Sequence, residues 1–267
     1  MEFEIKQKIS TCHTEYPVTL TDIGGININV VSIPKIVRDG TEEPIVLDCD
    51  YEMGKSSNTG LTIKWYIGQD LLYQWIQGTP PKASEEFLNH VDASYRASDD
   101  PDTMYRAVKL VRPGPDLSGE YRCVVFTHDD EDEARGRMLV YSPEHRFRLL
   151  HLHRRNDDAN RQLIVECIAE GVFPQPKITL LTDAEVIRDQ EHLYLERADG
   201  RFDVKAVAVL DTETLQLPIT LKCELYIQEA NYTAIREYVY SGSSEPPELS
   251  MAAYLLFAVV FFVDARG

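Results

Sequence analysis

The sequence predicts an all-β protein built as two tandem β-sandwiches. Three observations support this: short strand-like segments, turn residues between them, and two well-spaced pairs of cysteines. The chain has 267 residues, which suits two domains of roughly 100 residues each plus ends. Strand-like segments recur at intervals of about ten residues and alternate with proline- and glycine-rich turns. No long stretch keeps the roughly 3.6-residue apolar period of an amphipathic helix.

The boundary between the two domains is expected near Ser142-Pro143-Glu144. A strand-like run ends at Tyr141, and a proline cannot continue a β-ladder. The chain is therefore expected to divide into a poorly ordered leader, a first domain, a second domain, and a spacer with an apolar tail. The corresponding residues are 1–27, 28–142, 143–240 and 241–267.

The first domain carries a framework of cysteine, tryptophan and tyrosine residues. Cys49 is followed by Trp65 and later by Cys123, and Tyr121 stands two residues before that second cysteine, in a motif that begins at Asp116. A disulfide between opposed sheets, an indole packed against it and a tyrosine corner are typical of immunoglobulin domains. The long interval between the cysteines leaves room for two extra strands after Trp65. The first domain is therefore predicted to be a V-type immunoglobulin-like sandwich.

The second domain is predicted to be a C-like immunoglobulin sandwich, because its cysteines Cys167 and Cys223 lie closer together. Leu180 occupies the place where tryptophan is usual, and Leu221 the place of the corner tyrosine. The alternative is that Cys167 and Cys223 are ordinary buried thiols in another β fold. Cys12 lies outside both pairs and is expected to be a free thiol in the leader.

The alternation of side chains in a strand predicts a partner-binding face on the first domain. If Trp65, Tyr121 and Cys123 point inward, their sequence neighbours point outward. Two further aromatic residues share one side of the next strand and are candidates for the same face, the alternative being that they belong to the core. The predicted partner-binding residues are Lys64, Tyr66, Tyr73, Trp75, Arg122 and Phe126.

Two charged runs are candidate sites. The acidic run 128–133 lacks the alternating ligand spacing of an EF-hand, so we expect a solvated hairpin tip that could also steer a basic partner. The basic run 145–155 places His151 and His153 on one side of a strand, but no third or fourth zinc ligand lies nearby. We therefore expect no metal, and a polyanionic sugar is a weaker candidate partner for this run.

Composition and missing motifs exclude several functions. The 27 basic residues against 44 acidic residues give a formal charge of −17, which argues against non-specific nucleic-acid binding. The sequence contains no Walker loop, no H-E-x-x-H, no G-x-S-x-G and no G-x-G-x-x-G. The prediction is a protein without catalytic activity and without a cofactor.

The two ends of the chain point to different compartments. No cationic start followed by an apolar run is visible, and this alone favours the cytosol. At the other end, small residues, a polar spacer and the apolar run Met251–Val263 have the order of a glycolipid (GPI) anchor signal. The alternative is a buried final strand or helix. The candidate anchor residues are Ser241, Gly242 and Ser243, and the one N-glycosylation sequon begins at Asn231.

The sequence resembles the insect beaten-path family. The resemblance is carried by Ile33 to Gly40 leading into Leu47 to Glu52, by the segments around Trp65 and Trp75, and by Ser118 to Cys123. In the second domain it is thinner and depends on Leu217 to Cys223. The resemblance implies a neuronal recognition protein of the immunoglobulin superfamily that binds sidestep-family receptors and acts in cell adhesion and axon guidance.

An intracellular structural or scaffold protein with immunoglobulin modules is the alternative function. The missing signal peptide favours it. The paired cysteines, the sequon, the acidic balance and the apolar tail favour the cell surface or secretion.

Overall fold

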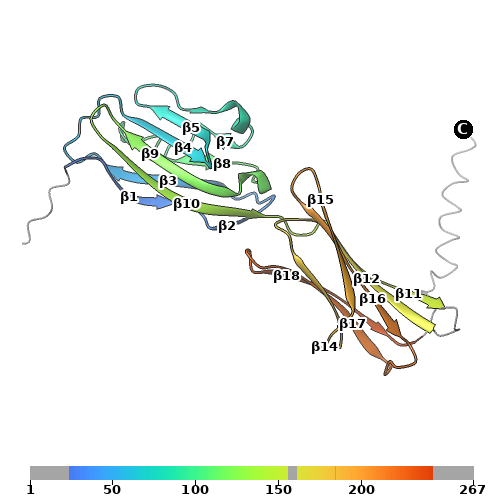
Figure 1. Ribbon diagram of the computed structural model, residues 1–267. Helices are drawn as coiled ribbons and strands as arrows, with labels where there is room; N and C mark the ends of the chain where they lie inside the picture. The colour runs from blue at the N-terminus through green and yellow to red at the C-terminus, as the bar shows by residue number, and fades with distance from the viewer. Residues whose placement is uncertain (1–23, 156–160, 184, 243–267) are drawn as a thin grey trace, which may run out of the picture.

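The computed structural model describes residues 24–155, 161–183 and 185–242, and these form two β-sandwiches joined end to end (Figure 1). The described part contains no α-helix, only two short 3-10 turns at Glu85–Phe87 and Pro115–Leu117. Each sandwich encloses one cluster of buried apolar side chains. The prediction of an all-β chain with two sandwiches is confirmed.

The first sandwich packs a four-stranded sheet against a six-stranded sheet. The smaller sheet has the order β1 (Asn27–Ser32), β3 (Ile45–Glu52), β8 (Val108–Leu110) and β7 (Val91–Asp92). The larger sheet has the order β2 (Ile36–Arg38), β10 (Glu131–Tyr141), β9 (Gly119–Phe126), β4 (Thr62–Ile67), β5 (Asp70–Ile76) and β6 (Lys82–Ala83). The ladder between β2 and β10 is parallel and the others are antiparallel.

The hairpin between β4 and β5 is tight because Gly68 has a φ of 57°, a conformation that side chains disfavour. β5 and β6, which follow β4, are the two extra strands expected from the long interval between Cys49 and Cys123. They widen the sheet that contains Trp65, and so enlarge its outward face.

The core of the first sandwich is the predicted framework. A disulfide joins Cys49 on β3 to Cys123 on β9, across the two sheets. Trp65 is fully buried beside it and donates a hydrogen bond from its indole to the Arg106 carbonyl, at 3.0 Å. Tyr121 is also buried, and its hydroxyl donates to the Leu117 carbonyl at 2.7 Å, the contact expected of a tyrosine corner. Burial raises the pKa of Tyr121.

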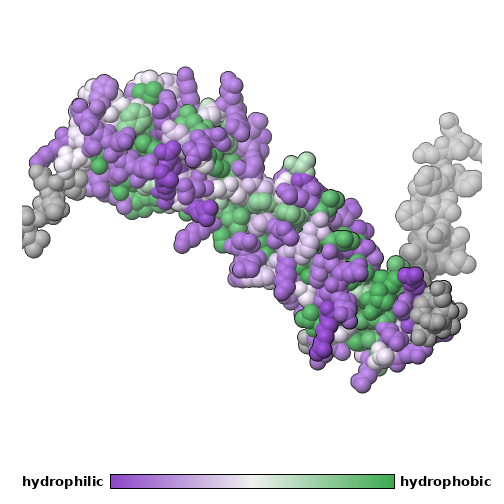
Figure 2. All heavy atoms as spheres, in the orientation of Figure 1, coloured by the Kyte–Doolittle hydropathy of each residue, from purple (hydrophilic) through white to green (hydrophobic). Residues whose placement is uncertain are grey.

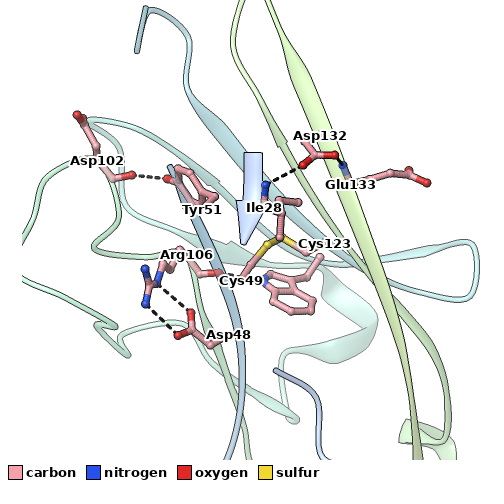
Figure 3. The surroundings of a disulfide bond; sticks show 10 residues. Ile28, Asp48, Cys49, Tyr51, Asp102, Arg106, Cys123, Asp132 and Glu133 are labelled. Atoms are coloured by element: carbon pink, nitrogen blue, oxygen red, sulfur yellow. Dashed lines mark hydrogen bonds and ion pairs between the residues drawn. A yellow bond between two sulfur atoms is a disulfide. The ribbon is translucent and has the colours of Figure 1, made fainter. Parts of the chain in front are cut away.

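Asp116, expected in the framework because it begins the tyrosine-corner motif, is not a core residue: its carboxylate is 60% exposed and lies 3.2 Å from the imidazole of His90. The charged residue beside the framework is the half-buried Arg106. It forms a bidentate ion pair with Asp48, which Figure 3 shows, and a further contact with Asp50. The Arg106 backbone that accepts the Trp65 hydrogen bond is thereby fixed against β3.

The second sandwich contains two four-stranded sheets. One has the order β11 (Arg146–Arg155), β12 (Arg161–Val172), β16 (Phe202–Asp211) and β15 (Gln190–Glu196). The other has the order β14 (Glu185–Val186), β13 (Lys177–Thr182), β17 (Ile219–Ile227) and β18 (Tyr232–Tyr240). A second disulfide joins Cys167 to Cys223, and Leu180, which pairs with Cys223, is fully buried in the tryptophan's place.

The joint between the sandwiches combines apolar and charged contacts. Tyr141, the last residue of β10, packs on the second core and lies 5.7 Å from the ring of Tyr232. The Asp39 carboxylate of the first sandwich accepts hydrogen bonds from Arg201 of the second, at 2.6 Å, and from Ser142, at 2.5 Å. The structure thus connects the two bodies through side chains as well as through the chain itself.

Candidate binding face

The outward side chains of β4, β9 and β10 form a continuous surface on the larger sheet of the first sandwich, called here the β4–β9–β10 face. Inward and outward residues alternate strictly on β9, where Tyr121, Cys123 and Val125 are fully buried. The expected outward register of Lys64, Tyr66, Arg122 and Phe126 is therefore confirmed. The face comprises Lys64, Tyr66, Arg122, Val124, Phe126, Glu133 and Arg135.

At the centre of the face an aromatic ring and a guanidinium group are stacked. Tyr66 and Arg122 are cross-strand partners, and the Arg122 guanidinium lies 4.4 Å from the centre of the Tyr66 ring. The same guanidinium donates to the Glu133 carboxylate at 3.1 Å. A cation held between a ring and a carboxylate keeps one orientation, so the groups that a partner would meet are preorganised.

Glu133 links this centre to a second arginine. Arg135 donates to Glu133 at 2.8 Å and lies 3.5 Å from Glu120. Hydrogen bonds from Arg135 and then from Arg122 hold the pKa of Glu133 below its ordinary value, so its carboxylate is charged at neutral pH. The face therefore presents interleaved positive and negative groups, which suits a protein partner with a matching mixture of charges.

Lys64 and Phe126 extend the face toward the end of the first sandwich that lies away from the second one. The Lys64 ammonium lies 5.2 Å from the centre of the Phe126 ring. The aliphatic stem of a lysine and the ring of a phenylalanine can cover the sheet while the lysine ammonium stays in water. Two cation–aromatic pairs on adjacent strands give the face both apolar area and fixed charge.

Tyr73 and Trp75 do not belong to this face, and the prediction that they bind a partner is wrong. Tyr73 pairs directly with Trp65 and Trp75 with Ile63, and residues opposite one another in an antiparallel pair share a side. Both therefore point inward, and they are only 1% and 2% exposed. Tyr73 donates to the Tyr105 carbonyl at 3.0 Å. The outward positions of β5 are taken instead by residues such as Ile76.

The acidic run is only partly a solvated loop tip. The backbone amide of Ile26 donates to Asp130 at 2.6 Å, and that of Ile28 donates to Asp132 at 2.7 Å, as Figure 3 shows for the second pair. These carboxylates satisfy one donor in β1 and one just before it, on the edge that faces β10. Sequence reasoning missed this role, because the partners are 104 residues apart and no local motif marks them.

The basic run 145–155 is divided between two sides of β11. Arg146 and Arg148 point outward and both pair with Glu170. His151 points the other way and stacks on Tyr238 at 4.5 Å, and burial, followed by the charge of His153, lowers its pKa. In the described part of the chain, no group of three or more His, Cys, Asp or Glu side chains could hold a metal ion. The sugar-binding prediction for this run gains no support from these contacts.

Asn231 lies at the exposed tip of the hairpin between β17 and β18, with a φ of 48°. An N-linked sugar there would project into solvent. Among the candidate anchor residues Ser241 and Gly242 close the described chain, whereas Ser243, the tail Met251–Val263 and Cys12 lie outside the described residues. Within the described residues no helix is long and apolar enough to span a membrane.

Comparisons with known proteins assign the fold. No protein-family model matches the sequence, and no curated protein matches it. The chain is structurally similar to bovine butyrophilin, with a TM-score of 0.61, 16% identity, and coverage of 77% of this chain and 94% of the other. It is also similar to a chain in the crystal structure of ICOS in complex with ICOS-L and an anti-ICOS-L VNAR domain, with a TM-score of 0.55, 13% identity, and coverage of 78% and 100%.

A third similar structure is the full Ig1–Ig3 ectodomain of mouse nectin-like molecule 4, with a TM-score of 0.54 and 12% identity. The match covers 79% of this chain and 66% of that one. Identities this low support a common fold and no closer relationship. Together with the two inter-sheet disulfides, they show that the chain consists of tandem immunoglobulin-like β-sandwiches.

Proposed function

We propose that the chain is a non-catalytic recognition protein of the cell surface or the extracellular space. Its partner is another immunoglobulin-superfamily surface protein, which it binds through the β4–β9–β10 face. The observation that carries the proposal is the stacked Tyr66–Arg122–Glu133 group, a half-buried aromatic and guanidinium pair held in one geometry on a broad sheet. Tyrosine and arginine are the residues on which protein interfaces most often depend.

Two kinds of observation support the location and the class of partner. Both disulfides would be reduced in the cytosol, and they persist in oxidising compartments. Of the similar structures, one is described as an ectodomain and another as ICOS in complex with ICOS-L. The same observations disfavour the intracellular scaffold alternative.

The resemblance to the beaten-path family makes the proposal more specific. On that basis the partner is a sidestep-like receptor, and the biological role is adhesion and axon guidance. Attachment to the membrane would follow cleavage near Ser241–Ser243 and addition of a glycolipid. Release of the protein from cells by a phosphatidylinositol-specific phospholipase would support that attachment, and a mature chain that retains Val263 would contradict it.

The binding proposal is tested with the secreted chain on an array of immunoglobulin-superfamily ectodomains that includes sidestep-like receptors. For the partner that binds, Tyr66→Ala is expected to weaken affinity by about 30-fold, the loss of roughly 2 kcal/mol at a hot spot. The matched control is Tyr194→Ala, which removes an exposed tyrosine from β15 of the second sandwich. Thermal melts accompany both variants. Normal binding by Tyr66→Ala, or a loss that only follows unfolding, would show that the face is wrongly assigned.

A further inference from the structure

The second sandwich carries an exposed apolar surface that the proposed function does not use. It lies on the outward side of the β11–β12–β16–β15 sheet, where aliphatic residues occupy successive positions in register. Leu152, Ile164 and Val209 form one row across three strands, and Leu152 and Val209 are 58% and 52% exposed. Figure 2 shows hydrophobic spheres gathered where β11 and β16 end and β12 begins. The aliphatic face comprises Leu150, Leu152, Ile164, Ile168, Leu193, Val207 and Val209.

The charges at the centre of this face are already neutralised within the chain. Lys205 donates to Glu166 at 2.8 Å, and Glu166 lies in the row next to the aliphatic one. A partner therefore needs no charged group opposite the centre of the face. Contiguous aliphatic residues on a sheet are an unusual surface for a solvated domain and mark a contact with another protein.

The two edges of the face carry opposite charges in one row. Arg154 on β11 pairs with Gln162 on β12, which in turn pairs with Asp211 on β16. All three share the outward side by alternation, and among the described residues neither Arg154 nor Asp211 takes part in an ion pair. One intervening strand separates them, so they do not meet within the chain.

We propose that this face binds a second copy of the chain in a two-fold symmetric dimer. An axis that runs parallel to the strands, between β12 and β16, brings Val209 of one copy over Ile164 of the other. The same axis carries the β11 edge of each copy over the β16–β15 edge of its partner. Arg154 of one copy then lies beside Asp211 of the other, so that opposite charges meet across the interface.

The axis also fixes the relative direction of the two chains. The chain enters the second sandwich at Arg146 and leaves it at Tyr240, which lies beside His153 at the opposite end of β11. A rotation about an axis parallel to the strands keeps this direction, so both first sandwiches project from the same end. The dimer is thus a side-by-side pair, and it leaves both β4–β9–β10 faces free.

The size of the face indicates a weak dimer. Four strands about 4.8 Å apart and roughly ten residues long cover about 20 by 30 Å. This is at the lower end of specific protein interfaces, so we expect a dissociation constant of about 1–100 μM. Two copies held near one another on a membrane would reach such concentrations, and the pair would then bind a clustered partner with higher avidity.

Sedimentation equilibrium of the full chain tests the proposal. The wild-type protein should sediment as a dimer that dissociates in the micromolar range. Val209→Glu, which places two carboxylates near the axis, should weaken the dimer at least about tenfold, or 1.4 kcal/mol. The control Val239→Glu changes an equally exposed valine on β18 of the opposite sheet and should leave the dimer unchanged. Thermal melts check that both variants fold.

A charge exchange distinguishes a direct contact from a general effect on the surface. Arg154→Glu alone and Asp211→Arg alone should each weaken the dimer, and the double variant should restore it. A wild-type chain that stays monomeric up to about 100 μM would overturn the proposal. So would equal dimerisation of Val209→Glu and Val239→Glu, absence of the charge rescue, or a dimer that depends only on the tail Met251–Val263.

Discussion

Which residues of the first sandwich can meet a partner is decided by the side to which each one points. Trp65 and Tyr66 are neighbours in sequence, yet the first is fully buried against the disulfide and the second lies on the outward side, stacked with the half-buried guanidinium of Arg122. The same alternation separates Tyr121 from Arg122. Substitutions at adjacent positions should therefore have opposite consequences, one for stability and the next for binding.

The first prediction concerns Trp75, which the sequence places on the binding face and the structure places in the core. Its ring packs edge-on against Tyr105 at 5.5 Å and is 2% exposed. Trp75→Ala is expected to lower the free energy of unfolding of the first sandwich by about 3–5 kcal/mol through the cavity that it leaves. Ile76→Ala, at the exposed neighbouring position, is expected to change it by less than about 1 kcal/mol.

Chemical denaturation of the two variants measures this difference. If the Trp75→Ala protein were as stable as the wild type, Trp75 would not be a core residue and would again be a candidate binding residue.

The cysteines give the second prediction. The sequence has five, and four of them form the disulfides Cys49–Cys123 and Cys167–Cys223. Titration of the secreted, denatured protein should find one free thiol, that of Cys12. Removing the Cys49–Cys123 bridge should cost about 2–5 kcal/mol of stability, as in other small secreted domains. Five titratable thiols would instead indicate a reducing compartment and favour the intracellular alternative.

The residues that could be predicted from the sequence are those next to a recognisable inward anchor. Lys64, Tyr66 and Arg122 flank Trp65, Tyr121 or Cys123, so alternation alone sets their side. The side of Tyr73 and Trp75 depends on the register between β4 and β5, which a bulge between Trp65 and Tyr66 shifts. That register is a property of the folded sheet, and no local pattern reports it.

At the scale of the strand, β1 shows how an edge is closed without a ladder. It pairs with β3 on one side. On the other side the Ile28 amide donates to Asp132, and the amide of Ile26, just before the strand, donates to Asp130. An exposed edge strand invites pairing with other chains, and side-chain acceptors that occupy its donors remove that opportunity. Because the amide donors and the carboxylates are far apart in sequence, the sequence alone indicates only a solvated loop tip for the acidic run.

The third prediction follows from this contact. Asp132→Ala removes the acceptor of the Ile28 amide and should destabilise the attachment of β1 by about 1–3 kcal/mol, the cost of an unsatisfied donor. The measurement is hydrogen exchange at the Ile28 amide, which should become faster. Glu131→Ala, at an exposed neighbouring position, serves as the control. Unchanged exchange in Asp132→Ala would mean that β1 is held by its ladder with β3 alone.

At the scale of the whole molecule, the joint determines how the binding face is presented. Arg201 and Asp39 are each only 18% exposed, and Ser142 joins them in one hydrogen-bonded group. Nearby, burial and then the Glu144 carboxylate raise the pKa of Tyr232 to about 12, so its hydroxyl remains a donor at all physiological pH values. The two sandwiches are thus expected to hold a preferred angle.

The fourth prediction tests that angle. Arg201→Met removes the ion pair across the joint and should weaken it by about 1–2 kcal/mol. Distances between spin labels on the two sandwiches should then spread over a wider range. Arg197→Met is the matched control, because Arg197 pairs with Asp203 inside the second sandwich. An unchanged distance distribution in Arg201→Met would mean that the angle is set without this ion pair, by contacts such as that of Tyr141 with Tyr232 and the Ser142–Asp39 hydrogen bond.

Hydrogen exchange of the intact chain, free and bound to the partner that the array identifies, shows whether the first sandwich binds through the β4–β9–β10 face. We expect new protection in β4 (Thr62–Ile67), in β9 (Gly119–Phe126) and around Glu133, with no change in the β1–β3–β8–β7 sheet. Protection confined to that opposite sheet or to the second sandwich would contradict binding through this face.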